Sequence, residues 1–155
     1  MRRSILAVVL SLLVLPALAG ASDADDAAAP VKKFIDGFNT GDVKGALATC
    51  ASPAVIIDEL PPYLWQGPTA CADWANDYDA DAKKKGVTEG FVKASKPTHV
   101  EVTGDRAYVV VPTAYTHKRN GKKVSQTGST MAVTLRKGAD GWKITGWAWA
   151  TGKVK

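Results

Sequence analysis

Cysteine, methionine and histidine each occur only twice in this chain of 155 residues, and only 8% of the residues are aromatic. Two cysteines cannot form the dense disulfide framework of a small secreted scaffold, although they can form one bridge. Because His99 and His117 lie far apart and lack a convergent third ligand, the sequence predicts no metal site and no other cofactor.

A large excess of charge of one sign is also missing. The formal charge is +5, but Arg2 and Arg3 lie in a segment that we expect to be removed, which leaves 18 basic against 15 acidic residues and a net charge of +3. A nucleic acid partner would need a stronger and more clustered surplus, so none is expected. The 46% hydrophobic content is that of a folded chain, and the length fits one domain.

Residues 1–21 have the pattern of a secretory signal peptide. Two arginines precede an apolar run over residues 5–15, and small residues allow cleavage after Ala19 or Ala21. The run is shorter than the about 20 residues that a membrane span needs. We therefore expect an exported protein, periplasmic or secreted, with no stable membrane span after signal removal.

Export bears on Cys50 and Cys71, because an oxidising compartment favours a disulfide between them. Two inert buried thiols are the alternative. No histidine lies near either cysteine in sequence, which argues against a catalytic thiol. Residues 22–29, rich in Asp and Ala, are predicted to be a flexible leader, and residues 30–155 to be the domain.

Three helices are predicted in the first half of this domain. Apolar residues recur at helical spacing from Pro30 to Gly41, a short second helix ends before Pro53, and a third runs from Thr69 to Gly86. Short strands are expected at 54–57 and 63–66. Long antiparallel strands follow at 98–103, 106–117, 124–135 and 143–150, with Asn120-Gly121 as a hairpin turn. Helices first and a sheet afterwards indicate an α+β fold.

Four short motifs occur in order along this pattern. They are Phe38-Asn39-Thr40-Gly41-Asp42, Trp65-Gln66-Gly67-Pro68, Gly104-Asp105-Arg106-Ala107 and Asp140-Gly141-Trp142-Lys143-Ile144. Together they resemble the nuclear-transport-factor-2-like (NTF2-like) superfamily, in particular its SnoaL-like and ketosteroid-isomerase-like branches. The resemblance implies a cone-shaped curved antiparallel sheet closed by three N-terminal helices, an apolar pocket inside the cone and often a homodimer. It implies no single activity, because members include isomerases, cyclases, dehydratases and binding domains.

Strand alternation predicts which side chains enter the cone. Val109 and Val111 belong to one buried set, and Met131, Val133 and Leu135 to another, but ideal pairing across the hairpin would put the two sets on opposite faces. A bulge near Pro112, which cannot donate a ladder hydrogen bond, restores agreement. Five small residues then face inward, while Tyr115 and His117 face outward: the five are Ala114, Thr116, Ser125, Thr127 and Ser129.

Asp58 is the candidate catalytic residue, because it ends the first short strand, about where ketosteroid-isomerase-like proteins carry a catalytic carboxylate. Burial would raise its pKa and suit it to proton abstraction. A solvated loop carboxylate beside Glu59 is the alternative. The family pattern also uses a first-helix tyrosine as a hydrogen-bond donor, and this helix offers only Phe34 and Phe38. Steroid isomerase activity is therefore not expected.

Other polar clusters give weaker signals. His99 and His117 are expected to be exposed, and the acidic run at 77–81 departs from a calcium loop at its sixth and twelfth positions. Lys118, Arg119, Lys122 and Lys123 form a basic hairpin tip. It is either a solvated tip that discourages edge pairing or a contact for an anion or a membrane surface.

The aromatic residues suggest a ligand site. They cluster around the second short strand and the third helix, and Trp147 and Trp149 share one strand face, which points inward if Gly146 is a bulge and outward otherwise. We predict binding of a small apolar or amphipathic molecule by Asp58, Tyr63, Trp65, Trp74, Tyr78, Thr127, Ser129 and Trp147. One alternative is a SnoaL-type isomerase or cyclase with Asp58 as general base. The other is a dimerising interaction domain that uses the Trp147/Trp149 face.

Overall fold

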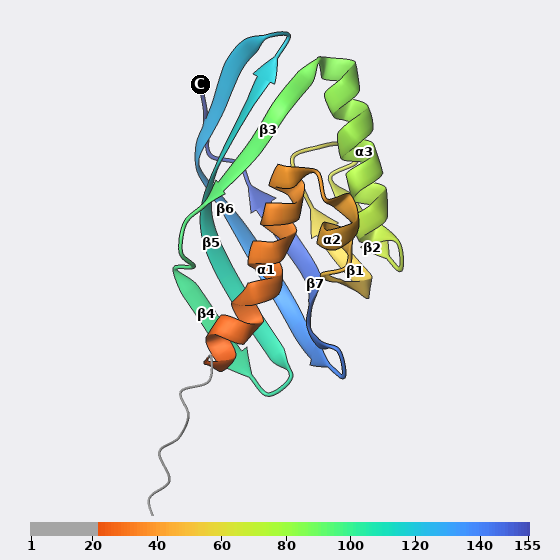
Figure 1. The fold of residues 1–155 in the computed structure, drawn as a ribbon, viewed down its shortest axis with the longest axis vertical. Helices are drawn as coiled ribbons and strands as arrows, with labels where there is room; N and C mark the ends of the chain where they lie inside the picture. The colour runs from red at the N-terminus through yellow and green to blue at the C-terminus, as the bar shows by residue number, and fades with distance from the viewer. Residues whose placement is uncertain (1–21) are drawn as a thin grey trace, which may run out of the picture.

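The computed structural model describes residues 22–155 (Figure 1), so the predicted signal peptide lies outside the described residues. Helices α1 (Asp23–Thr40) and α2 (Val43–Leu47) come first, followed by strands β1 (Cys50–Ile57) and β2 (Leu64–Gly67) and helix α3 (Ala70–Lys85). Six strands complete the chain: β3 (Val87–Ala94), β4 (His99–Thr103), β5 (Arg106–Arg119), β6 (Lys122–Gly138), β7 (Gly141–Ala150) and β8 (Lys153–Val154).

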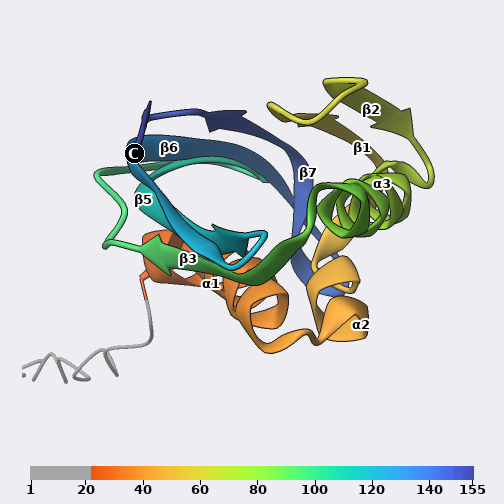
Figure 2. The ribbon, with the colours of Figure 1, turned by 90° about the horizontal axis from the view of Figure 1, so that it is seen from above.

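The strands form one curved sheet in the order β2-β1-β7-β6-β5-β3, with β4 added to β5 and β8 to β6. Its concave side holds α1, and α3 lies beside it (Figure 2). The pairing of β1 with β7 is parallel, so the sheet is mixed and not wholly antiparallel as predicted. Parallel pairing needs a long connection, and the two strands are far apart in the chain. The α+β fold with three helices agrees with the prediction.

Helix α1 begins at Asp23, so residues 22–29 are its N-cap and first turns, and the predicted flexible leader is wrong. The Ser22 hydroxyl accepts a hydrogen bond from the Asp25 N–H at 3.2 Å. Three aspartates in the first turn also interact favourably with the positive end of the helix dipole. Ala27 is fully buried, which shows that the fold covers this turn. The Asp and Ala composition suggested a leader because it lacks large apolar residues.

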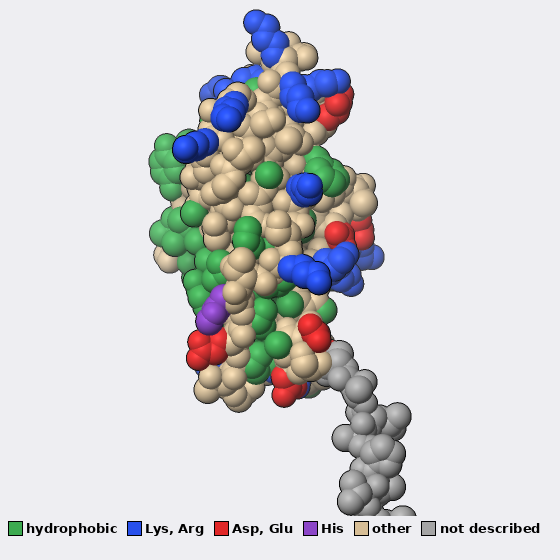
Figure 3. All heavy atoms as spheres, turned by 90° about the vertical axis from the view of Figure 1, so that its left-hand side faces the viewer, with side chains coloured by type: hydrophobic (Ala, Val, Ile, Leu, Met, Phe, Trp, Pro, Cys, Tyr) green, Lys and Arg blue, Asp and Glu red, His purple; other side chains and the backbone are tan. Residues whose placement is uncertain are grey.

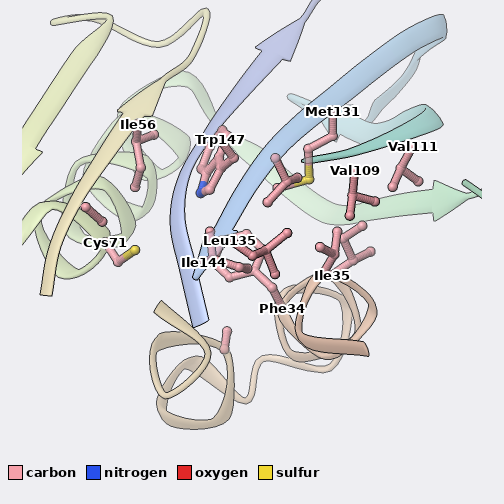
Figure 4. Close-up of a cluster of buried hydrophobic side chains, with 14 of the residues drawn as sticks. Phe34, Ile35, Ile56, Cys71, Val109, Val111, Met131, Leu135, Ile144 and Trp147 are labelled. Atoms are coloured by element: carbon pink, nitrogen blue, oxygen red, sulfur yellow. The ribbon is translucent and has the colours of Figure 1, made fainter. Parts of the chain in front are cut away.

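The core lies between α1 and the concave face of the sheet. Phe34 and Ile35 point from α1 toward side chains of β5, β6 and β7 (Figure 4). Val109 and Val133, which pair across β5 and β6, are completely buried. Burial of these side chains stabilises the helix against the sheet by about 1.5–3 kcal/mol each.

Strand β3 has no counterpart in the sequence prediction. It pairs with β5 along one side only, and its register shifts between Thr88 and Phe91. Within β3 only Val92 is buried, so the apolar alternation that identifies a strand is absent. An edge strand with a bulge is therefore difficult to find from sequence.

The bulge between β5 and β6 lies close to the predicted place but on the other strand. Thr113 pairs with Ser129 and Ala114 with Thr127, so the extra residue is Gly128 of β6, whose φ is +73°. Glycine adopts this conformation without a Cβ penalty. Because β5 itself is continuous, its alternation does not change.

This difference reverses part of the predicted inward set. Tyr115 and His117 stay on the inner face of β5, and on β6 Val124 and Gln126 face inward ahead of the bulge. Thr127, predicted to face inward, is exposed, whereas Ser129 beyond the bulge is buried as expected. Because the extra residue belongs to β6 and not to β5, the side chains of both strands between the bulge and the hairpin turn lie on the opposite face from the one predicted.

Cys50 and Cys71 form a disulfide, as predicted, with their Cα atoms 6.6 Å apart. The bridge joins the start of β1 to the first turn of α3. It therefore fastens to the sheet the helix that carries Trp74 and Tyr78.

Candidate functional site

A cavity of about 410 Å³ lies between α1, α3 and the concave face of the sheet. Pockets for small molecules have volumes of about 300–1,000 Å³ and mainly apolar walls with a few polar groups. Seven of the 22 residues that line this cavity are aromatic: Phe34, Phe38, Trp74, Tyr78, Tyr115, Trp147 and Trp149.

Helical spacing brings the aromatic walls together. Phe34 and Phe38 are four residues apart on α1, and Trp74 and Tyr78 are four apart on α3, so each pair lies on one helix face. The Phe38 and Tyr78 ring centroids are 5.1 Å apart. Trp74 meets Trp147 of β7 edge to face at 4.9 Å, a favoured geometry for aromatic pairs.

Trp147 and Trp149 both line the cavity, so the outward-facing tryptophan patch of the interaction-domain alternative does not exist. The register between β6 and β7 shifts after the pair Thr134–Gly146, because Leu135 pairs with Ile144. Thr145 is thus the additional residue, next to the position considered from sequence. The bulge turns the end of β7 so that both indoles face the helices.

Asp58 follows β1 directly and reaches the cavity wall. Its Oδ2 accepts a hydrogen bond from Trp74 Nε1 at 2.7 Å, and its Oδ1 accepts one from the Glu59 N–H at 2.6 Å. Burial raises the pKa of Asp58, and the Trp74 hydrogen bond opposes that shift in part. The solvated loop carboxylate of the alternative interpretation does not describe this half-buried side chain.

Two tyrosines form a hydrogen-bonded pair in the wall, one from α3 and one from β5. The hydroxyl oxygens of Tyr78 and Tyr115 are 2.7 Å apart. A Cβ at Gly90 of β3 would lie 2.9 Å from the Tyr78 hydroxyl and 3.0 Å from that of Tyr115. Burial raises the pKa of both tyrosines, so each keeps its proton at neutral pH.

His117 is a buried wall residue, which corrects the expectation that it is exposed. It is 7% exposed and stacks on Tyr115 with centroids 4.9 Å apart. Neither ring nitrogen has a hydrogen-bond partner within residues 22–155. Burial lowers the pKa of His117, nearby Arg119 acts in the same direction and Glu59 in the opposite one. The imidazole is therefore neutral at pH 7.

A hydrogen-bond network closes one side of the cavity. Gln126 Nε2 donates to Glu59 Oε1 at 2.6 Å, while Gln126 Oε1 accepts from Trp149 Nε1 at 3.2 Å and from the Ser129 hydroxyl at 3.3 Å. The network fixes the orientation of the Trp149 indole. Ser129 thus acts behind the wall and does not line the cavity.

Three other predicted site residues lie away from the cavity lining. Tyr63 is 58% exposed. Thr127 faces solvent because the bulge at Gly128 turns it to the outer face of the sheet. Trp65 is buried, but its Nε1 donates to Asp77 Oδ2 at 2.8 Å and so links β2 to α3. Of the predicted set, Asp58, Trp74, Tyr78 and Trp147 line the cavity.

Residues that sequence reasoning did not assign to the site are Tyr115, His117 and Gln126. Glycine inside a strand pattern is a bulge signal, and Gly128 is such a residue. Had the bulge been located there, the alternation would have turned all three inward. His99 is exposed on β4, as expected.

Within residues 22–155 there is no group of three or more His, Cys, Asp or Glu side chains able to hold a metal ion. In the same part of the chain, no helix combines the length and the apolar character that crossing a membrane requires.

Solved structures similar to this one share its fold at low sequence identity. A ketosteroid isomerase-like protein from Erwinia carotovora atroseptica has a TM-score of 0.66 and 18% identity, over 85% of this chain and 98% of that one. An NTF2-like superfamily protein from Salmonella enterica serovar Typhimurium has 0.67 and 15%, over 81% and 88%. A hexachlorocyclohexane dehydrochlorinase (LinA) type 2 has 0.67 and 11%, over 82% and 86%.

No family model and no curated protein sequence matches the chain. The structural likeness therefore carries the assignment, and it shows that this chain has the NTF2-like fold predicted from the four motifs.

Proposed function

We propose that this protein is an exported binding protein that holds a small amphipathic molecule, with a polar group as well as an apolar body, in its cavity. The observation that carries the proposal is the cavity of about 410 Å³, whose lining includes seven aromatic side chains and Asp58 and beside which polar atoms are buried without partners. Both ring nitrogens of His117 and the Nε1 of Trp147 are buried and unpaired within residues 22–155.

Buried polar groups without partners cost about 1–3 kcal/mol each, which is why nearly all of them are hydrogen-bonded in folded proteins. Neighbouring side chains cover these atoms, so a hydroxyl or carbonyl group of a bound molecule would reach them only after side chains of the wall move. The aromatic walls would contact its apolar part, and Asp58 would offer a carboxyl group as polar anchor.

Native mass spectrometry of the mature protein, purified from the compartment to which it is exported, tests this proposal. We expect a mass above that of the polypeptide that is lost on denaturation and identifies the ligand class. A variant Trp147→Phe, which removes the unpaired donor and replaces the indole of the wall by a smaller aromatic ring, should retain less of that mass than Trp142→Phe. Trp142 is buried outside the cavity lining and also has an unpaired Nε1. Equal retention in both variants would contradict the role of the cavity.

A second candidate function is a proton-transfer enzyme of the SnoaL type, with Asp58 as general base. The half-buried carboxyl group with its raised pKa favours it, because proton abstraction near neutral pH needs such a group. The variant Asp58→Asn separates the two functions. A binding protein should keep affinity for the co-purified molecule within about tenfold, whereas an enzyme should lose turnover of it by about 10²–10⁴-fold.

Asp36→Asn is the matched control, since Asp36 is an exposed carboxylate of α1 outside the cavity lining. If Asp58→Asn behaved like Asp36→Asn in both affinity and turnover, Asp58 would be neither the polar anchor nor the general base, although the binding function itself would stand.

Export and a homodimer belong to the same proposal. Cleavage after Ala19 or Ala21 is tested by the N-terminal sequence of the exported protein.

For the dimer we propose the outer face of β1 and β2, where Val55, Ile57 and Leu64 are 44%, 50% and 49% exposed. Ile57→Lys should convert a dimer into a monomer in sedimentation experiments, and a monomeric unmodified protein would contradict the interface.

A further inference from the structure

Two cations lie at the open end of the cavity, although three carboxylates, those of Asp58, Glu59 and Asp81, also belong to the lining. Among the residues that line the cavity, Lys85, Arg119, Glu59 and Val154 are the exposed ones. They come from the end of α3, the tip of hairpin β5–β6, the loop after β1 and strand β8. The cavity therefore opens to solvent between these segments, and two of its four rim residues are cations.

These cations belong to a larger group that we call the basic end. It collects cationic side chains from three segments that are far apart in sequence: Lys83, Lys84, Lys85, Lys118, Arg119, Lys122, Lys123, Lys153 and Lys155. Backbone hydrogen bonds join the segments, because the Asn120 N–H donates to the Gly86 carbonyl at 2.9 Å and Ser125 pairs with the C-terminal residue. Lysine and arginine side chains gather at the top of the molecule in Figure 3, the end at which the hairpin projects.

Acidic residues neutralise only part of this group. Lys83 pairs with Asp79, Lys85 with Asp81 at 2.8 Å, and Lys118 with Glu89 at 2.6 Å. Arg119 forms no ion pair or side-chain hydrogen bond within residues 22–155, although it lines the cavity. The carboxylate of Glu59, the acid at the rim, is engaged by Gln126 and by the Thr151 hydroxyl.

We propose that the molecule in this cavity is an amphipathic carboxylate, whose head group binds between Lys85 and Arg119 while its apolar body extends inward to the aromatic walls. This inference rests on the proposed binding function and names its ligand class. A planar guanidinium suits a carboxylate, which it can bind through two parallel hydrogen bonds. The lining also includes Val87, Val124 and the aromatic side chains, which can contact the apolar body of such a molecule.

The cations at and near the basic hairpin tip fall into two groups, one that faces solvent and one that lines the cavity. A tip that only discourages strand pairing needs charges facing solvent, and Lys122 and Lys123 meet that need without lining the cavity. Arg119 and Lys85 differ from them because they lie at the cavity rim. Charge at the rim also increases the local concentration of an anionic ligand.

Laurate and lauryl alcohol, which share one alkyl chain, are suitable probes below their aggregation concentrations. Binding is followed by calorimetry and by the fluorescence of the tryptophans in the wall. For the unmodified protein we expect laurate to bind about tenfold more tightly than the alcohol, a difference that falls as salt is raised. The double variant Lys85→Gln/Arg119→Gln should lose that difference and keep its affinity for the alcohol.

Lys122→Gln/Lys123→Gln is the matched control, because it removes the same charge from the same end without altering the lining. It should keep the preference for laurate. Equal losses in the two double variants would overturn the rim site in favour of a diffuse basic surface, as would equal binding of laurate and the alcohol. Binding of the alcohol alone would leave the proposed binding function standing, whereas binding of neither probe would contradict that function for alkyl ligands and the rim site with it.

Discussion

Removal of the disulfide tests how the cavity wall is held. The bridge closes a loop between residues 21 positions apart and connects β1 to the first turn of α3. We consider the double variant Cys50→Ala/Cys71→Ala, which leaves no free thiol. Cys71 is buried and Cys50 half-buried, so alanine avoids an unpaired polar group at either position.

The expected loss of stability follows from the loop length. In the chain-entropy description, a closed loop of this size lowers the entropy of the unfolded chain enough to stabilise the fold by about 3 kcal/mol. For a domain of this length the melting temperature should fall by about 10 °C. Helix α3 keeps three further hydrogen bonds to other elements: Trp65 to Asp77 at 2.8 Å, Trp74 to Asp58 at 2.7 Å and Tyr78 to Tyr115 at 2.7 Å. The folded variant should therefore keep the cavity and its ligand.

Urea unfolding of the oxidised protein and of the variant measures the difference, with ligand binding as the second readout. Reductant should destabilise the unmodified protein to about the level of the variant and leave the variant unchanged. A loss below about 1 kcal/mol would refute the entropic reasoning. Loss of ligand binding in a variant that is still folded would refute the idea that these three hydrogen bonds suffice to hold α3.

Two other predictions concern the bulge and the buried carboxyl group. Gly128→Ala should lower the free energy of unfolding by about 1–2 kcal/mol, because its φ of +73° is unfavourable for a residue with a Cβ. The added Cβ would contact nothing within 4 Å, so backbone strain is the only expected cause. Gly138→Ala, equally open and without a positive φ, should cost less, and equal losses would contradict the strain argument. A pH titration followed by carbon NMR should give a midpoint above 3.8 for the Asp58 carboxyl group, because burial raises its pKa. This shift adds stability that is fully present below pH 3.8 and is lost as pH rises through the folded-state pKa. A midpoint at or below 3.8 would contradict burial as the cause.

Local sequence signals predicted much of the fold. The helical spacing of Phe34 and Phe38, the glycine stop at Gly41 and the turn at Asn120-Gly121 are decided by residues close in the chain. They identified α1, its end and the long hairpin without reference to tertiary contacts. The cysteine pair needed one more premise, the oxidising compartment inferred from residues 1–21.

Part of the candidate site could not be predicted in the same way. Asp58, Trp74, Tyr78 and Trp147 were named from motifs and clustering, and all four line the cavity. His117, Tyr115 and Gln126 were missed, because their side depends on which strand carries the extra residue. The alternation of apolar residues required one bulge between β5 and β6, but an extra residue on either strand would have met that requirement.

The sequence by itself therefore determined the three helices and the strands other than β3 and β8, their order and the pairing of the cysteines, since these depend on local propensity and on compartment. Only the tertiary structure decided which polar atoms meet inside the cone and which cations surround its open end. The reason is physical. Strand side chains alternate with a period of two, so one inserted residue reverses which side chains face the cavity beyond it. The basic end joins segments that are far apart in sequence and that only folding brings together.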